Sequence, residues 1–266
     1  MANITADMVK ELRDKTGAGM MDCKKALTQS EGDIEKAIDF LRKSGIAKAE
    51  KKSGRATKEG KAFMLIEGKT AAMVEVLCET DFAASNEKFT GFVNGILART
   101  MKLDGNGDIT EKVQESEKEN LVSIIAIIGE NIQIRRAARW ETAGQIGSYL
   151  HQGGRVGVIV DVEGDCDQAL LGEICMHIAA FRPQYICPAC VAPEVIEKEK
   201  EIAAAQLKDK PANMIEKIVM GKINKWYTEV CLVKQPWIKD DKTSLEKLNP
   251  NIKVKRFLRW EVGEEL

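Results

Sequence analysis

The sequence has no excess of either charge, few aromatic residues and no long apolar run, and each absence excludes a class of protein. Its 40 Lys and Arg against 41 Asp and Glu give a formal net charge of -1, whereas domains that mainly neutralise phosphate backbones are basic. Aromatic residues are 5% of the chain, too few for the stacking platforms that bind single-stranded nucleic acid. No apolar stretch reaches the roughly 18 residues of a membrane span, and the N-terminus lacks a signal-peptide core. We therefore expect a cytoplasmic protein with no membrane contact.

Residues that usually carry chemistry are also scarce. The only histidines are His151 and His177; the first ends a predicted strand and is a candidate surface contact, while the second lies in an apolar helix and is interpreted as a core residue. No Ser/His/Asp or Cys/His set can be assembled, and no phosphate-binding loop is present. We therefore expect no enzyme activity, no cofactor and no metal site.

Cysteine supplies the one pattern that leaves an alternative open. The chain has seven cysteines, an odd number that favours reduced, buried thiols in a cytoplasmic protein. Cys187 and Cys190, in the sequence CPAC, have a spacing typical of metal or redox sites. A structural zinc site needs about four ligands, and no second pair is present. A metal- or thiol-dependent enzyme using these two residues remains the less favoured alternative.

Helical periodicity dominates the first part of the chain. Thr5 is a suitable N-cap for a first helix, the sequence TGAG at 16–19 interrupts it, and a second helix is predicted from about residue 22. A third helix follows Gly32, with apolar residues at helical spacing. Three helices of this size bury only a small core, which is more typical of a docking module than of an enzyme. The stretch 48–61, KAEKKSGRATKEGK, is interpreted as a linker or a solvated helix end.

The rest of the chain alternates strand and helix patterns. Two strands joined by the turn Gly68-Lys69, a helix and the strand IQIRRAARWE predict one β-β-α-β unit, and a similar order after residue 145 predicts a second. Two apolar-striped helices between about residues 193 and 228, split at Lys210-Pro211, predict an inserted antiparallel hairpin. The predicted fold is α+β in four parts: 1–54, three helices and a linker; 55–140, the first core unit; 141–186 with 231–266, the second; and 187–230, the hairpin.

An acid and an aromatic residue stand side by side where the second predicted strand ends. This stretch, CETDFAASNEKF, runs from Cys78 to Phe89. Neither a core phenylalanine nor a catalytic aspartate explains the pair formed by Asp81 and Phe82. The residues alone leave open why the two stand together at this place.

Several motifs resemble those of bacterial elongation factor Ts. The stretch LRDKTGAGMMDCKKAL at 12–27 is similar to the N-terminal signature of that family, and TDFAASNEKF at 80–89 is similar to its second signature. Ala83 and Ser85 depart mildly from the usual valine and basic residue of the second motif. IGENI at 128–132 and HQGGRVGV from His151 also match. The resemblance covers nearly the whole chain in order.

The resemblance implies a guanine-nucleotide exchange factor for elongation factor Tu, the GTPase that delivers aminoacyl-tRNA. It implies a three-helix N-terminal domain like ubiquitin-associated domains, a two-subdomain α/β core and an inserted helical hairpin, or coiled coil. Exchange would disturb the magnesium and phosphate site of the GDP-bound partner, release GDP and let GTP rebind. The nucleotide-free partner would bind most tightly, so nucleotide and factor would weaken each other's binding.

The resemblance also implies the contact residues. A wedge near the magnesium and nucleotide would consist of Thr80, Asp81 and Phe82. The other implied contacts lie in several segments, the last being the weakest: Met20, Met21, Lys24, Ile128, Gly129, His151 and the region near Trp237. Many family members continue past EVGE into a helical tail that packs on the GTPase domain; this sequence ends at Leu266, so that contact is not expected from these residues.

One further alternative is an RNA-binding accessory protein of translation that uses the basic stretch 48–61 and the sheet faces. The balanced charge and the scarcity of aromatic residues count against it. We therefore expect no direct contact with nucleic acid.

Overall fold

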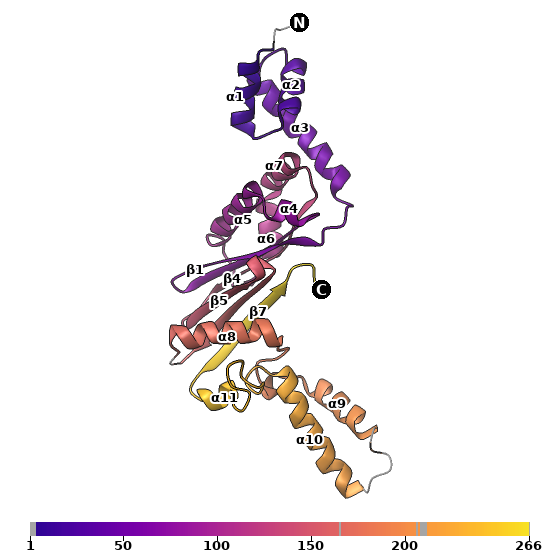
Figure 1. The fold of residues 1–266 in the computed structure, drawn as a ribbon, viewed down its shortest axis with the longest axis vertical. Coiled ribbons are helices and arrows are strands. Elements are labelled where there is room, and N and C mark those ends of the chain that lie inside the picture. Colours follow the sequence, from indigo (N-terminus) through magenta and orange to yellow (C-terminus); the bar gives the residue numbers. More distant parts are fainter. Residues whose placement is uncertain (1–3, 165, 206, 208–211, 266) are drawn as a thin grey trace.

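The computed structural model describes residues 4–164, 166–205, 207 and 212–265. Figure 1 shows an elongated arrangement, with a helical bundle at the N-terminal end, two sheets in the middle and a helical hairpin at the far end. The bundle consists of α1 (Ala6–Thr16), α2 (Met20–Gln29) and α3 (Ile34–Lys52). The predicted α+β class, with its three N-terminal helices, is confirmed.

The ends of the three helices follow from local capping. Thr5 caps α1 by accepting a hydrogen bond from the backbone N–H of Met8 at 3.3 Å, and Gly17 ends it with φ 66°, a conformation that suits glycine. One boundary differs from the prediction, since helix α2 begins at Met20. Helix α3 continues through Lys52 because its last turns are rich in Ala, Lys and Glu, which are strong helix formers; the first part of the stretch 48–61 is therefore a helix end, one of its two interpretations. The connection to the first strand is therefore only residues 53–58.

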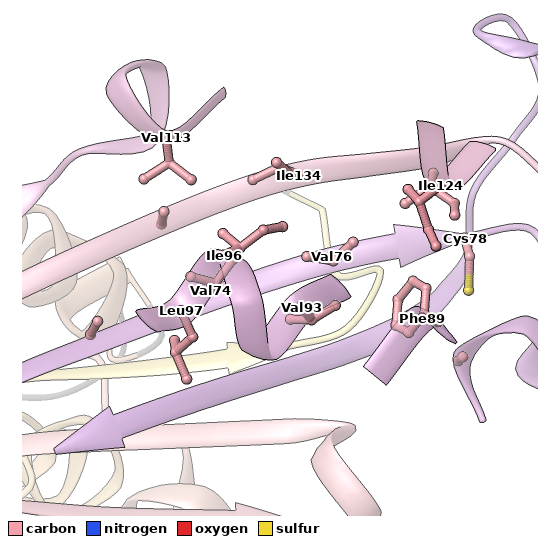
Figure 2. Packing of buried hydrophobic residues seen from close by; sticks show 14 of the residues in the cluster. Val74, Val76, Cys78, Phe89, Val93, Ile96, Leu97, Val113, Ile124 and Ile134 are labelled. Atoms are coloured by element: carbon pink, nitrogen blue, oxygen red, sulfur yellow. The ribbon is translucent and has the colours of Figure 1, made fainter. Parts of the chain in front are cut away.

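The first sheet and its helices form the first β-β-α-β unit. The sheet is antiparallel with the order β1-β2-β4-β3. Helix α5 packs its apolar side on the sheet, and Figure 2 shows Phe89, Val93 and Ile96 from this helix against Val74 and Val76 of β2. The short strand β3 was not predicted, because its residues lie in the polar sequence DGNGD. The elements are β1 (Glu59–Glu67), β2 (Thr70–Cys78), α4 (Asp81–Ala84), α5 (Glu87–Thr100), β3 (Gly107–Asp108), α6 (Thr110–Ser116), α7 (Lys118–Ile128) and β4 (Ile132–Glu141).

The second sheet repeats this order. Strands β5, β6 and β7 pair antiparallel in that order, and α8 covers one face. The repeat extends to matched residues. In the first unit, the buried acid Glu75 lies at a bulge of β2 opposite Arg136 of β4; in the second unit, the buried acid Asp161 lies at a bulge of β6 opposite Arg256 of β7. The elements are β5 (Gln145–His151), the 3-10 turn η1 (Gln152–Gly154), β6 (Val156–Glu163), α8 (Gln168–Phe181) and β7 (Lys253–Glu261).

The two units hold each other through reciprocal contacts. The sequence pattern R-x-x-R-W-E occurs at 136–141 and again at 256–261. The guanidinium of Arg136 lies 4.7 Å from the ring centre of Trp260, and that of Arg256 lies 4.5 Å from the ring centre of Trp140. Both indoles are buried in a cluster shared by the two sheets, so each unit closes part of the core of the other.

The inserted hairpin lies between α8 and β7. It consists of α9 and α10, which pack through Ala203, Val219 and Ile223; the expected break at residues 210–211 lies outside the described residues. Among the helices that the structure describes, none combines the length and apolarity needed to cross a membrane. The elements of this region are η2 (Pro188–Cys190), α9 (Pro193–Ala205), α10 (Ala212–Val230) and α11 (Leu245–Leu248).

Candidate functional site

A single helical turn, α4, presents the acid and the phenylalanine at the exit of β2. Thr80 begins the turn, and its hydroxyl accepts a hydrogen bond from the N–H of Ala83 at 3.2 Å. Ala83 and Ala84 are buried against the first core, whereas the side chain of Phe82 is 87% exposed. A large apolar side chain that is exposed to solvent in this way indicates a surface that another molecule can bury.

Asp81 lies beside Phe82 on the same turn and is also exposed. One of its carboxylate oxygens, Oδ1, accepts a hydrogen bond from the backbone N–H of Phe82 at 2.9 Å. This contact fixes the carboxylate next to the aromatic ring. The pair therefore offers one apolar and one anionic group from the same rigid turn.

A carboxylate from the turn after α7 holds the base of this wedge. Glu130 accepts hydrogen bonds from the backbone N–H groups of Glu79 and Thr80 at 3.1 and 3.0 Å. Its second oxygen accepts a hydrogen bond from the Thr80 hydroxyl at 2.6 Å. In return, Glu79 accepts a hydrogen bond from the backbone N–H of Asn131 at 2.7 Å. The segment that follows β2 and the segment that precedes β4 are therefore joined by hydrogen bonds donated in both directions.

Asn131 extends this network to the connection after α3. The residue is buried, and its amide donates to the carbonyl oxygens of Ser53 at 3.3 Å and Arg55 at 2.8 Å. Arg55 also pairs with Glu79 at 3.4 Å. Glu79, Glu130 and Asn131 were not among the residues expected to act at a site. The sequence signal for the last two is the polar pair Glu-Asn between an apolar helix and an apolar strand.

The turn that carries Glu130 begins at Gly129. This residue ends α7 with φ 87°, and its N–H donates to the carbonyl of Ile125 at 2.9 Å. A residue with a side chain would be strained at this φ, so glycine lets the chain turn directly from α7 to Glu130 and its hydrogen bonds. Gly129 is exposed, and the preceding Ile128 is half-buried against the first core.

The TGAG turn brings the N-terminal bundle to the same region. A Cβ built on Gly17 would lie 3.3 Å from Cδ1 of Ile127 on α7, and the carbonyl of Gly17 accepts a hydrogen bond from Lys88 on α5 at 3.4 Å. The next residues open α2, where Met20 and Met21 are exposed, the latter at 77%. Lys24 is also exposed one turn later. The structure therefore connects the segments around residues 20, 81 and 129 through α5 and α7.

His151 lies on the second unit, away from this group. It is exposed at the end of β5, and its Nδ1 lies 3.2 Å from the hydroxyl of Tyr149. The following turn approaches β1, because Arg155 pairs with Glu59 at 3.0 Å. His151 is thus the one expected contact residue that is exposed on the second unit.

Trp237 and His177 both belong to the core of the second unit. The indole of Trp237 is 3% exposed and stacks on the ring of His177, with 5.0 Å between ring centres. His177 Nε2 is 3.0 Å from the Gln235 amide oxygen, and burial lowers the pKa of His177. The core interpretation of His177 is confirmed. The indole of Trp237 cannot reach a partner from this position, so we leave it out of the contact set.

Two thiols complete the residues singled out from sequence. Cys187 and Cys190 have their sulfur atoms 2.6 Å apart near the base of the hairpin. Within the described part of the chain, no group of three or more His, Cys, Asp or Glu side chains is placed to hold a metal ion. The arrangement at α4 and α7 therefore offers binding groups, whereas the thiol pair is a separate feature.

Comparisons with known proteins agree with the motifs that form these segments. The family described as "Elongation factor TS" matches residues 79–264. A protein named "Elongation factor Ts" from Thioalkalivibrio sulfidiphilus is 47% identical over 98% of this chain and 92% of its own length. Proteins of the same name from two strains of Clostridium botulinum are 44% and 45% identical over 98% of this chain and 93% of theirs. The chain belongs to the elongation factor Ts family.

Proposed function

We propose that the chain is a guanine-nucleotide exchange factor that binds elongation factor Tu in the cytoplasm and promotes the release of GDP. Membership of the family makes it a translation elongation factor. The observation that carries the finer proposal is the rigid α4 turn, on which Phe82 stands almost wholly free of its own protein. In this proposal Phe82 enters an apolar pocket of the GTPase domain, and Asp81 competes for the groups that order the magnesium ion and the phosphates.

The energetics require more than this wedge. Accelerating release about a thousandfold takes about 4 kcal/mol of barrier reduction, and burying one phenylalanine side chain contributes about 1.5–3 kcal/mol. The exposed methionines, Met20 and Met21, offer flexible apolar side chains that adapt to a partner surface. Together with Lys24, Ile128 and Gly129 they form a second contact, shared by the N-terminal bundle and the first unit, and His151 supplies a contact of the second unit.

The proposed reaction is an exchange of binding partners and needs no covalent step. If the exchange factor binds the nucleotide-free GTPase most tightly, its binding must weaken the affinity of the GTPase for GDP. By linkage, GDP weakens the affinity of the GTPase for the exchange factor to the same extent. GTP can then rebind and displace the factor. The factor is regenerated in each cycle, and no cofactor of its own is needed.

The function is tested by the release of a fluorescent GDP analogue from elongation factor Tu. We expect this chain, added at one-twentieth or less of the GTPase concentration, to release all of the bound analogue through many turnovers. Each GTPase molecule bound to the chain should lose its nucleotide about a thousandfold faster than the free GTPase, corresponding to about 4 kcal/mol. Excess unlabelled GDP prevents rebinding of the analogue. Fast release of only as much analogue as there is chain, with no turnover, would reject the exchange function.

Glu130 provides a test of how the wedge is held. Glu130→Ala removes three hydrogen bonds to Glu79 and Thr80, and the stranded donors are expected to loosen the turn at a cost of about 1–3 kcal/mol. We expect exchange to fall about tenfold and amide hydrogen exchange at residues 79–84 to quicken.

Two variants separate positioning from general damage. Glu130→Gln keeps an oxygen for the two backbone N–H groups and an amide that can donate to the Thr80 hydroxyl, so it should recover part of the loss. Glu119→Ala removes an exposed carboxylate from α7, the helix that precedes the Glu130 turn, and should change neither measurement. Normal exchange by Glu130→Ala, with unchanged protection of residues 79–84, would contradict a positioning role.

A further inference from the structure

A pair of thiols at the root of the hairpin has no part in the proposed exchange. Cys187 immediately precedes η2, and Cys190 is its last residue. Their sulfur atoms are 2.6 Å apart, and Cys190 is exposed while Cys187 is half-buried. Small molecules in solution can therefore reach the pair.

The backbone between the two residues is already folded for a cross-link. The N–H of Cys190 donates to the carbonyl of Cys187 at 2.9 Å, and that of Val191 donates to Pro188 at 3.2 Å. A closed four-residue turn keeps its end Cα atoms within about 7 Å, and disulfides span about 4.4–6.8 Å between Cα atoms. The sulfur atoms need only small side-chain rotations to reach bonding distance.

The flanking segments hold this turn in place. Before it, Tyr185 bridges to Cys231, and Val233 donates to the carbonyl of Ile186 at 3.1 Å. After it, Val191 is buried in the cluster at the base of α9 and α10. Because both ends are anchored, the two thiols remain opposed instead of separating in a mobile loop.

The remaining cysteines are poor competitors for an oxidant. All five are buried, and burial is the main reason that the pKa rises to about 12 for Cys78 and Cys175 and to about 11 for Cys231. Since the thiolate is the reactive form, these residues are expected to stay reduced. A zinc site is also disfavoured, because the described residues near the pair supply no set of three metal ligands.

We propose that Cys187 and Cys190 form a reversible redox site that exchanges with small-molecule disulfides of the glutathione type. One cysteine thiolate attacks a sulfur of the small disulfide, forms a mixed disulfide and releases one small thiolate. The other cysteine, as its thiolate, attacks the protein sulfur of the mixed disulfide and releases the second small thiolate. The two cysteine protons end on the two small thiols, so the protein is oxidised by two electrons and the small disulfide is reduced.

The chemical environment sets the rate of this exchange. Burial, followed by the hydrogen bond with Cys187, raises the pKa of Cys190. A raised pKa lowers the thiolate fraction near neutral pH, so uncatalysed oxidation is expected to be slow there and to quicken as the pH is raised.

The test uses the full-length native chain incubated with oxidised glutathione, quenched with acid and alkylated. We expect the number of alkylated thiols to fall from seven to five per chain. The chymotryptic peptide that starts after Tyr185 should carry no alkyl group and be lighter by about 2 Da than the same peptide with two free thiols. Treatment with a dithiol should restore both thiols. Retention of all seven thiols, a stable glutathione adduct on the native chain, or loss of thiols at the buried cysteines would overturn the proposal.

The single variants Cys187→Ser and Cys190→Ser provide matched controls. Each retains one accessible thiol but lacks the second thiol needed to resolve a mixed disulfide. Both should therefore stop at a glutathione adduct, heavier by about 305 Da. If either variant still loses two thiols without an adduct, the cross-link does not join Cys187 to Cys190, and the proposal is wrong.

Discussion

Phe82→Ala is expected to slow the proposed exchange reaction by about 10- to 100-fold while leaving the free energy of unfolding within about 0.5 kcal/mol of the native value. The ring is almost fully exposed, so its removal takes little from the folded chain. Burial of the same ring in a partner is worth about 1.5–3 kcal/mol, and about 1.4 kcal/mol is one factor of ten in rate. The measurements are GDP release from elongation factor Tu and urea unfolding of the free chain.

The control is a comparable truncation elsewhere. Leu248 is an exposed apolar residue on α11, at the far side of the second unit from α4 (Figure 1), and Leu248→Ala should leave exchange unchanged. Phe82→Leu should retain part of the activity because it keeps apolar surface. The double variant Asp81→Ala, Phe82→Ala should be slower than Phe82→Ala alone. Full exchange activity in that double variant would place the wedge elsewhere.

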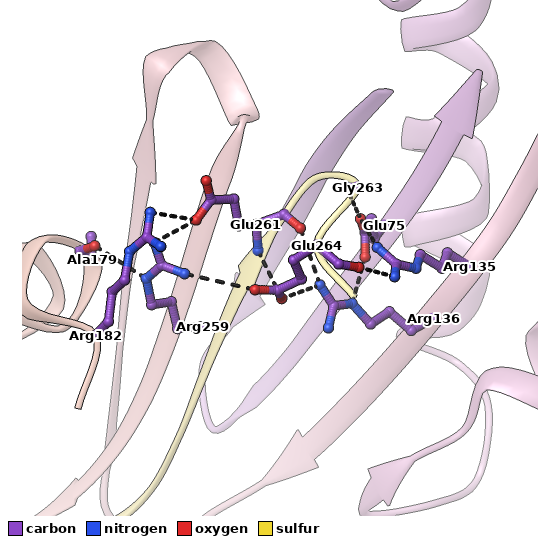
Figure 3. Close-up of polar contacts among 9 residues, drawn as sticks. All are labelled: Glu75, Arg135, Arg136, Ala179, Arg182, Arg259, Glu261, Gly263 and Glu264. Carbon is purple, nitrogen blue, oxygen red and sulfur yellow. Dashed lines mark hydrogen bonds and ion pairs between the residues drawn. The ribbon is translucent and has the colours of Figure 1, made fainter. Parts of the chain in front are cut away.

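Glu75→Ala is expected to lower the free energy of unfolding by about 3–5 kcal/mol, the range found when one partner of a buried ion pair is removed. The carboxylate of Glu75 is 0% exposed; it lies 2.5 Å from Arg136 and 3.4 Å from Arg135, and it accepts the backbone N–H of Gly263 at 3.2 Å. Figure 3 shows Glu75 beside Gly263 and the two arginines, at one end of a chain of polar contacts that continues through Glu264. Alanine leaves two guanidinium groups without their shared counter-charge.

A nearby exposed acid tests whether burial is the cause. Glu141 pairs with Arg139 through a carboxylate whose side chain is 59% exposed, and exposed pairs contribute about 1 kcal/mol or less. Glu141→Ala should therefore shift urea unfolding only slightly. A loss below about 1 kcal/mol for Glu75→Ala as well would show that the arginines find other partners or water, and the expected effect would be refuted.

The architecture could be predicted because its signals are local. Apolar spacing predicted the helices, Thr5 was predicted as a cap that the structure contains, and the turn at residues 68–69 predicted the first hairpin. The order of elements predicted two similar units. The stretch 48–61 was interpreted as a linker or helix end because it has no apolar face, and in the structure residues 48–52 are the end of α3.

The side-chain partners could not be predicted in the same way. Glu130 and Thr80 are 50 positions apart, and Asn131 reaches Arg55 across 76 positions; no local pattern specifies such pairs. Trp237 illustrates the converse case. The family resemblance placed its region in contact with a partner, but long-range packing buries the ring on His177. The contact role of Phe82 stays a prediction, which rests on the family resemblance and on the exposure of the ring.

The reciprocal stacking of Arg136 on Trp260 and of Arg256 on Trp140 has a mechanical consequence. Neither unit can rotate on the other without breaking both stacks at once, and each such contact contributes about 0.5–2 kcal/mol beyond the packing of the indoles. The distance between Phe82 on one unit and His151 on the other is therefore held fixed. In the proposed complex, the factor would bind only those arrangements of the partner's domains that fit this fixed distance, and it would select among them without changing its own conformation.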